Sequence, residues 1–343
     1  MNIFVNDYND LCHEKVWQAL ENIKKEANPG YGFDKHCDEA RRIIQEKTKG
    51  DPDVFFLPGG TITNILGLTA NLRPYEAIVT PDTGHIHRHE VGAPEAFGHK
   101  LITVPQQDGK ITVEGLKEVL KDYGSFYNVL PGILYISNTT ELGTIYTYEE
   151  MKALYEYAKE IGIYMYIDGA RMACAMVAAN IKWNQFPEIC DAFSLGGTKD
   201  GALFGEALIF FNKEMSKNFT FYMKQHGALM AKGFLLGVQY KALLEGEEGK
   251  ELYLENARIA NHMAKLFAKK WKEIGGTFYS TPVSNQIFIL IKKTWLEHLE
   301  KDNMFEIEDE DVNQEEMAIR LVMTYRTTEE ELNSFISQVK NLM

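Results

Sequence analysis

Short apolar runs alternate with helical stretches along the first 211 residues of the chain. The runs that resemble strands are residues 54–57, 77–79, 101–104, 132–136, 164–167, 192–195 and 207–211. Strands separated by helices join through crossover connections, so this alternation is typical of a parallel sheet with helices on both faces. The sequence therefore predicts an α/β fold built on a mainly parallel seven-stranded sheet flanked by helices.

The acidic stretch at residues 245–249 interrupts this alternation. With 343 residues, of which 45% are hydrophobic, the chain can bury a large core and divide into a large and a small domain. We predict that residues 1–247 form the large domain, including the N-terminal segment, and that residues 248–343 form a smaller α+β domain.

Apolar residues at helical spacing predict further helices at residues 11–26, from Asp34, from Thr61 and near 225–244. In the small domain we expect a helix near 250–274, strands near 277–280, 286–292 and 318–325, and a closing helix from Thr328. The acidic run at 306–311 is flanked by apolar residues, and we expect it to be a solvated loop.

The net charge of the chain argues against a nucleic-acid partner. The chain has 36 basic and 49 acidic residues, and its net charge of −13 gives no general basic face for nucleic acid, so a small organic substrate is expected. No stretch is long enough for a membrane span and the first residues lack a signal-peptide pattern, which favours a cytoplasmic protein. The four cysteines form no Cys-x-x-Cys pair and are expected to be reduced and structural.

Two polar residues follow neighbouring strands of the expected sheet. Asp168 comes directly after one strand, and Lys199 lies 31 positions later, after the next strand, among small residues. Ligands in such sheets bind beyond the carboxyl ends of strands. A lysine can form a Schiff base with the aldehyde of pyridoxal 5'-phosphate (PLP), and an aspartate can keep the pyridine nitrogen of PLP protonated. The pair therefore predicts a PLP site, although Asp168 alone could be a helix N-cap.

A glycine-rich turn, Gly59-Gly60-Thr61, also follows a strand and opens a helix. The free amides and the positive end of a helix dipole favour an anion at such a place. Gly60 and Thr61 are therefore candidate phosphate ligands. The same residues could equally form an ordinary turn with an N-cap.

Three histidines, His85, His87 and His89, stand at alternate positions. On a strand they would point to one side and could bind a metal, but we predict no metal site. His85 comes first after the strand and turn and is the candidate to stack on a pyridine ring. His87 and His89 could act as acid or base groups near a substrate, or could be surface residues.

Two arginines are candidate ligands for a substrate carboxylate. Arg171 lies three positions after Asp168, one helical turn away. Arg320 is a charge inside an otherwise apolar strand, which requires a partner. A buried structural ion pair is the alternative explanation for Arg320.

Together these residues resemble a known family, the PLP-dependent threonine aldolases of the β-eliminating lyase group. The resemblance covers nearly the whole chain and implies the aspartate aminotransferase-like fold (PLP fold type I), with a small C-terminal domain. The motifs that carry it are Asn6-Asp7-Tyr8, Tyr31-Gly32-Phe33-Asp34, Gly60-Thr61-Ile62-Thr63-Asn64, His85 with Glu90-Val91-Gly92-Ala93, Asp168-Gly169-Ala170-Arg171, Thr198-Lys199 and Arg320-Leu321-Val322.

The resemblance implies a role for each matching residue. Lys199 holds the cofactor, Asp168 meets the pyridine nitrogen and His85 stacks on the ring. The phosphate and cofactor ligands include Gly60, Thr61 and Thr198. Arg171 and Arg320 hold the substrate carboxylate, assisted by Asn6, which stands in place of the family's usual serine. Enzymes of this kind are homodimers or homotetramers with active sites at the subunit interface, and residues 224–232 resemble the segment that reaches a neighbour's phosphate.

The chain departs from the family pattern at two places. Thr140 occupies the position where many threonine aldolases have a histidine after Asn-Thr, and residues 199–206 replace the more usual Ser-Lys-Gly-Leu-Gly run. These departures concern the substrate and not the cofactor.

The predicted function is therefore a PLP-dependent lyase that cleaves the Cα–Cβ bond of a β-hydroxy amino acid. Threonine or allo-threonine, giving glycine and acetaldehyde, is the first substrate to expect, with one of the histidines handling the hydroxyl proton. A β-eliminating amino-acid lyase is the nearest alternative. An aminotransferase and a non-catalytic PLP-binding protein are further alternatives.

Overall fold

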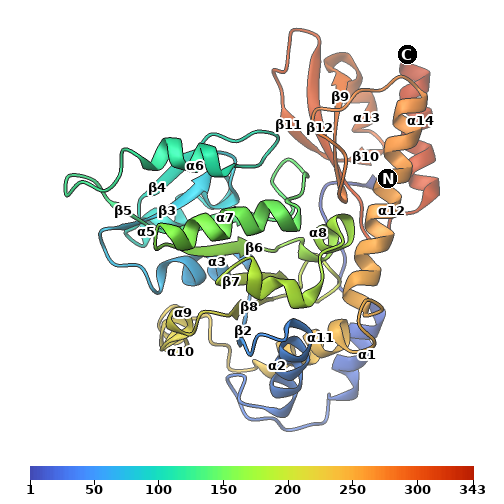
Figure 1. Cartoon of the computed structure of the whole chain (residues 1–343). Helices are drawn as coiled ribbons and strands as arrows, with labels where there is room; N and C mark the ends of the chain where they lie inside the picture. The colour runs from blue at the N-terminus through green and yellow to red at the C-terminus, as the bar shows by residue number, and fades with distance from the viewer.

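The computed structural model describes all 343 residues and contains the large sheet that the sequence predicts (Figure 1). Its seven strands lie in the order β2-β8-β7-β6-β5-β3-β4. Only β8 runs antiparallel to its neighbours, so the sheet is mainly parallel as expected. The strand bounds are β2 Asp53–Leu57, β3 Glu76–Pro81, β4 Leu101–Val104, β5 Leu130–Ser137, β6 Tyr164–Asp168, β7 Ala192–Gly196 and β8 Glu206–Phe210.

Helices bury both faces of this sheet, because successive strand residues point to opposite sides. In β5, Ile133 and Tyr135 pack toward α3 (Gly60–Thr69), whereas Leu134 and Ile136 pack toward α7 (Tyr148–Glu160). The other helices of this part are α4 His85–Arg88, α5 Ala93–Ala96, α6 Val113–Leu120, α8 Met172–Ala179 and the 3₁₀ helix η1 Trp183–Glu188.

The helices α1 (Glu14–Asn22), α2 (Lys35–Thr48) and α11 (Phe234–Leu244) pack together beyond β2 (Figure 1). The sequence predicts one helix over 225–244, and this prediction is wrong. Instead, α9 (Lys213–Ser216) is followed by α10 (Phe219–Gln225), and residues 226–233 are not helical. Gly227 follows the end of α10 with φ +73°, a left-handed conformation that ends helices.

The C-terminal part has an antiparallel sheet, β11-β12-β9, that packs against two long helices. Phe267, Trp271 and Phe335 form the aromatic centre of its core. Its elements are α12 Leu252–Glu273, β9 Gln286–Lys292, the 3₁₀ helix η2 Lys293–Trp295, α13 Leu296–Leu299, β10 Asn303–Met304, β11 Glu306–Asp309, β12 Glu316–Val322 and α14 Glu329–Leu342.

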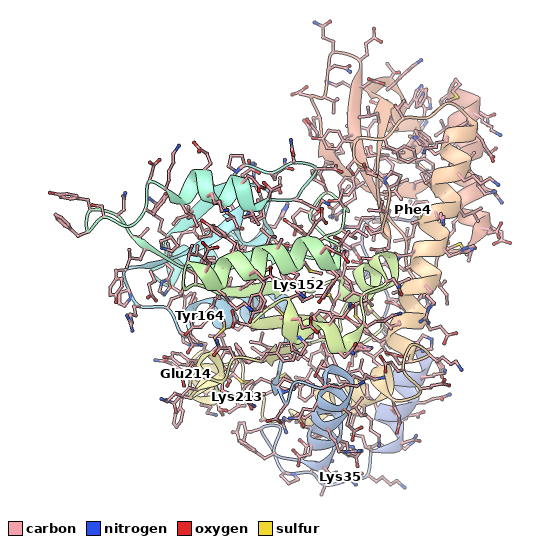
Figure 2. The ribbon with its side chains drawn as sticks, viewed as in Figure 1. Phe4, Lys35, Lys152, Tyr164, Lys213 and Glu214 are labelled. Atoms are coloured by element: carbon pink, nitrogen blue, oxygen red, sulfur yellow. The ribbon has the colours of Figure 1, made fainter.

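The N-terminus lies against this C-terminal part. Strand β1 (Asn2–Ile3) pairs with β10, and Figure 2 shows Phe4 where the small sheet meets α12. Phe4 is fully buried and makes an edge contact with Phe335, with ring centroids 6.0 Å apart. The first residues of the chain therefore connect the small core to the large sheet.

Two predictions for the small part are wrong. Residues 306–309 form strand β11 and not a solvated loop, because Ile307 and its neighbours pair with β12. Residues 277–280 form no strand, and only Phe278 makes an isolated bridge to Ile289.

All four cysteines are free and buried, as expected of structural thiols. None of the helices has the length and apolar character required to cross a bilayer.

Candidate active site

A polar cavity of about 370 Å³ lies at the carboxyl edge of the large sheet. Seven of the predicted site residues line it, and they come from separate elements of the large sheet and its connections: Gly60, Thr61, His85, Asp168, Arg171, Thr198 and Lys199. Four others do not line it: Asn6, His87, His89 and Arg320.

Lys199 follows β7 through the turn Gly196-Gly197-Thr198. A side chain at Gly197 would come within 2.6 Å of the carbonyl of Gly205, so the close approach of these strands requires glycine there. The Lys199 ammonium lies 5.9 Å from the centre of the Tyr8 ring. Burial and the nearby Arg171 guanidinium lower the pKa of Lys199, although the charges of Asp7, Glu141 and Asp168 oppose this. The neutral amine, which is the nucleophilic form, is therefore more populated than in free lysine.

Asp168 is the last residue of β6, and four polar groups surround its carboxylate. Its Oδ2 accepts hydrogen bonds from Asn64 Nδ2 at 2.7 Å and from the Tyr135 hydroxyl at 2.8 Å. Its Oδ1 accepts from the Ala170 amide at 3.0 Å and from the Ser194 hydroxyl at 3.4 Å. Burial raises the pKa of Asp168, but the His85 charge and these hydrogen bonds outweigh it and lower the pKa overall. Asp168 is therefore held as an anion that can pair with a cationic ring nitrogen.

His85 is the first residue of the short helix α4, and its Nδ1 lies 2.8 Å from Oε1 of the buried Glu90. Burial lowers the pKa of His85, yet the hydrogen bond to Glu90 and the charges of Glu141 and Asp168 raise it overall. The imidazole is thus held in one orientation at the wall of the cavity, with its protonated form favoured.

The three histidines do not lie on a strand, so the arrangement in which all three point to one side is wrong. Residues 85–88 are helical, so His85 and His89 share a face with ring centroids 5.5 Å apart, while His87 points elsewhere. His87 and His89 are both exposed and lie outside the cavity lining. Four residues are too few for periodicity to distinguish a strand from a helical turn.

The N-terminus of α3 forms another wall of the cavity. A Cβ added at Gly59 or Gly60 would meet no atom within 4 Å, so the space beside this backbone is open. The first amides of a helix have no acceptor within the helix, and its dipole favours negative charge there. This turn therefore fits a phosphate group.

Arg171 precedes α8 and makes a two-pronged ion pair with Asp7. Its Nε lies 2.7 Å from Oδ2 and its Nη2 3.0 Å from Oδ1 of that carboxylate. Asn285 adds a hydrogen bond of 3.1 Å to Asp7. The guanidinium lines the cavity and its Nη1 donates to no protein atom, so this nitrogen is available to a ligand.

Arg320 and Asn6 lie outside the lining of the cavity. Arg320 forms an ion pair with Glu306, directly opposite it on β11, and its Nε is buried without an acceptor. Asn6 accepts a hydrogen bond from the amide of Tyr8, and the N-terminal segment reaches the cavity through Tyr8 instead.

A family model described as β-eliminating lyase matches residues 13–294 of the chain. The chain belongs to the β-eliminating lyase family. Low specificity L-threonine aldolase from a Pseudomonas species is 32% identical over 302 residues, covering 86% of this chain and 85% of the relative. The enzyme of the same name from Pseudomonas aeruginosa is 29% identical over 299 residues, with coverage of 86% and 85%. These similarities place the chain within the threonine aldolase group of the family.

Solved structures agree with this placement. A threonine aldolase from Leishmania major matches 100% of this chain and 99% of its own, with a TM-score of 0.95 and 36% identity. Aspartate aminotransferase from Thermotoga maritima matches 99% of this chain and 91% of its own, with a TM-score of 0.73. At 12% identity, this match shows the fold alone. The predicted PLP fold type I is confirmed.

Sequence reasoning missed two carboxylates in the site of this threonine aldolase family member. Glu206 is the first residue of β8, and its Oε2 accepts a hydrogen bond of 2.9 Å from the Gly197 amide. Burial raises the pKa of Glu206 to about 7. Glu141, in the turn after β5, also lines the cavity. The sequence offered a signal for both residues. Glu141 follows one predicted strand and Glu206 directly precedes another, and both positions lie at the edge of the sheet where the carboxyl ends of the parallel strands meet.

Proposed function

We propose that the chain is a PLP-dependent aldehyde-lyase that cleaves the Cα–Cβ bond of threonine or allo-threonine to give glycine and acetaldehyde. The observation that carries this proposal is the cavity that Lys199, Asp168 and the N-terminus of α3 share. The relatives support the reaction, because both are named low specificity L-threonine aldolase.

The residues around the cavity fit PLP. Lys199 offers an amine of lowered pKa, Asp168 an anion for the ring nitrogen, and the amides of Gly60 and Thr61 a phosphate site. The Thr198 hydroxyl and the ring of His85 are the remaining contacts that we propose for the cofactor. When bound, PLP supplies an aldehyde carbon for amines and a protonated ring that withdraws electrons from the substrate's Cα.

The protein's own residues orient the substrate. Arg171, held by Asp7, presents Nη1 to the substrate carboxylate and so fixes which bond of Cα faces the ring. The resemblance alone supports Asn6 and Arg320 as further carboxylate ligands. For His87 and His89, acid–base roles rest on their place in the sequence beside His85, and both lie outside the cavity lining.

We further propose that the protein is cytoplasmic and forms homodimers or homotetramers with active sites at the interface. The exposed aromatic side chains of Tyr31, Phe33 and Phe221 beside α10 and α2 support a surface that another copy covers. Residues 224–232 lie in the same region, since the Lys224 ammonium is 4.4 Å from the centre of the Tyr31 ring.

Incubating the purified protein and PLP with L-threonine or L-allo-threonine tests the reaction. We expect equal amounts of glycine and acetaldehyde in an assay coupled to alcohol dehydrogenase. Ammonia with a keto acid would instead show β-elimination, and amino transfer to the cofactor would show an aminotransferase. The absence of every product over a panel of β-hydroxy amino acids would contradict an enzymatic role.

A further inference from the structure

The proposed reaction requires a group that removes the proton of the substrate's β-hydroxyl. Two carboxylates of the cavity already have hydrogen-bond donors, since Asp168 bonds Asn64 and Tyr135, and Glu206 bonds the Gly197 amide. His85 is bonded through Nδ1 to the buried Glu90, and we assign its ring to stacking on the cofactor. Glu141 is the lining carboxylate that makes no hydrogen bond or ion pair with the protein.

The turn that carries Glu141 is held rigidly beside Asp168. It follows β5, and the amide of Asn138 donates to the carbonyl of Asp168 at 2.9 Å. Within the turn, the Thr140 amide donates to the carbonyl of Thr144 at 2.9 Å, and the hydroxyls of these two threonines are 2.7 Å apart. Thr140 is buried and its hydroxyl is already hydrogen-bonded to Thr144. The side chain that lines the cavity is that of the next residue, Glu141.

The C-terminal part of the chain fastens the other side of this turn. The Ser280 hydroxyl donates to the carbonyl of Leu142 and the Ser284 hydroxyl to the carbonyl of Gly143, both at 2.7 Å. The side-chain Nε2 of Gln286 donates to the Thr139 hydroxyl at 3.2 Å. Residues on both sides of Glu141 are thus fixed by hydrogen bonds, while its own carboxylate is left free.

The charge of Glu141 acts on groups of the cavity that lie near it. Its negative charge favours the protonated forms of His85, Arg171 and Lys199, so the carboxylate is within electrostatic range of all three. These are the residues to which we assign the cofactor ring, the substrate carboxylate and the cofactor aldehyde. A substrate held by these residues would lie in the cavity that Glu141 lines.

We propose that Glu141 is the base that takes the β-hydroxyl proton, an inference that rests on the proposed function. The O–H bond breaks and its proton moves to the Glu141 carboxylate, while the O–H electron pair becomes the second C–O bond of the aldehyde. The electron pair of the Cα–Cβ bond stays with Cα, where a proton from solvent completes glycine. Glu141 returns its proton to solvent after the aldehyde leaves.

Glu141→Gln tests this proposal, because it keeps the size of the side chain and removes its basicity. We expect threonine cleavage to fall by roughly 10²–10⁴-fold. The visible absorption of the bound cofactor and the exchange of the glycine α-proton with deuterium from the solvent, followed by NMR, should stay within a few-fold of the wild type. Glycine has no hydroxyl, so its exchange does not need this base.

Glu149→Gln is the matched control, because Glu149 is an exposed carboxylate of α7 with no ion pair. Glu141→Asp, which keeps a carboxylate, should cleave threonine faster than Glu141→Gln. Unchanged cleavage by Glu141→Gln would overturn the inference and leave the proposed function standing. Loss of glycine exchange along with cleavage would also overturn it, because Glu141 would then act on binding or on Cα. A wild-type protein without cofactor absorption and without exchange would refute the proposed function itself.

Discussion

Burial and Arg171 keep the amine of Lys199 reactive, and Asp7 is one of three carboxylates that limit this effect. Burial and Arg171 lower the pKa of Lys199, whereas the charge of Asp7 raises it. An amine attacks an aldehyde only when deprotonated, so the pH at which cofactor attachment reaches half its maximal rate follows this pKa.

We predict that Asp7→Asn moves this half-maximal pH downward. The substitution removes a negative charge near the amine and frees the Arg171 guanidinium, and both changes disfavour the ammonium form. The rate at which the apo-protein incorporates PLP, followed by absorbance across pH, measures the shift. Asp302→Asn, an exposed site without an ion pair, is the control. An upward shift would show that Asp7 does not act electrostatically on Lys199.

Glu206 makes the folded protein less stable when it is ionised. The pKa of Glu206 is raised from 4.5 to about 7, so the folded chain holds the proton more tightly than the unfolded chain does. The free energy of unfolding therefore falls as the pH rises through that interval. Below it, both states are protonated and the contribution vanishes.

Glu206→Gln should remove this penalty. In urea unfolding of the apo-protein at about pH 8, we expect the variant to exceed the wild type by up to about 3 kcal/mol. The difference should shrink toward about pH 4.5. A variant that is less stable than the wild type at the higher pH would show that ionised Glu206 is stabilised in the fold.

At the scale of elements, the turn after β5 depends on one glycine. Gly143 has φ +73°, and a Cβ there would lie 2.9 Å from the carbonyl of Gln286. Gly143→Ala should lower the free energy of unfolding by about 1–3 kcal/mol. Thermal unfolding compared with Gly59→Ala, where a Cβ meets no atom, measures the difference. An equal decrease in the free energy of unfolding for the two variants would show that the backbone moves away from Gln286 without destabilising the fold.

The sequence predicts the elements that depend on long apolar patterns and misses those that depend on distant partners. All seven strands of the large sheet could be found, because buried parallel strands are continuous apolar runs. Strand β11 was missed because its polar residues face solvent, and only its pairing with β12 makes it a strand. The short helix α4 was ambiguous because its pattern spans a single turn.

The residues of the candidate site divide in the same way into those with a local sequence pattern and those with distant partners. Asp168, Lys199 and Gly60 were predicted to lie together, because each follows a strand of the sheet. The structure agrees, since all three line one cavity. The partner of Arg171, Asp7, is 164 residues away along the chain, and no local pattern shows such a pair. Glu141 was missed because its direction is set by contacts of its turn with the C-terminal part.

At the scale of the whole molecule, the N-terminal segment joins the small core to the cavity that Arg171 lines. Phe4 is buried in that core, and Asp7, three residues later, holds Arg171. Phe4→Ala should cost about 3–5 kcal/mol in the free energy of unfolding, because it leaves a cavity among aromatic rings. Phe126→Ala, at a side chain that is 88% exposed, should cost little. Similar decreases in the free energy of unfolding for both variants, measured with denaturant, would show that Phe4 does not anchor the N-terminal segment in the small core.

The proposed function requires that Lys199 carries PLP opposite Asp168. Borohydride reduction of the PLP-loaded protein, followed by peptide mass spectrometry, measures it most directly. We predict that the reduced cofactor is found on the peptide that contains Lys199. Finding it on another lysine, or on none, would contradict the account.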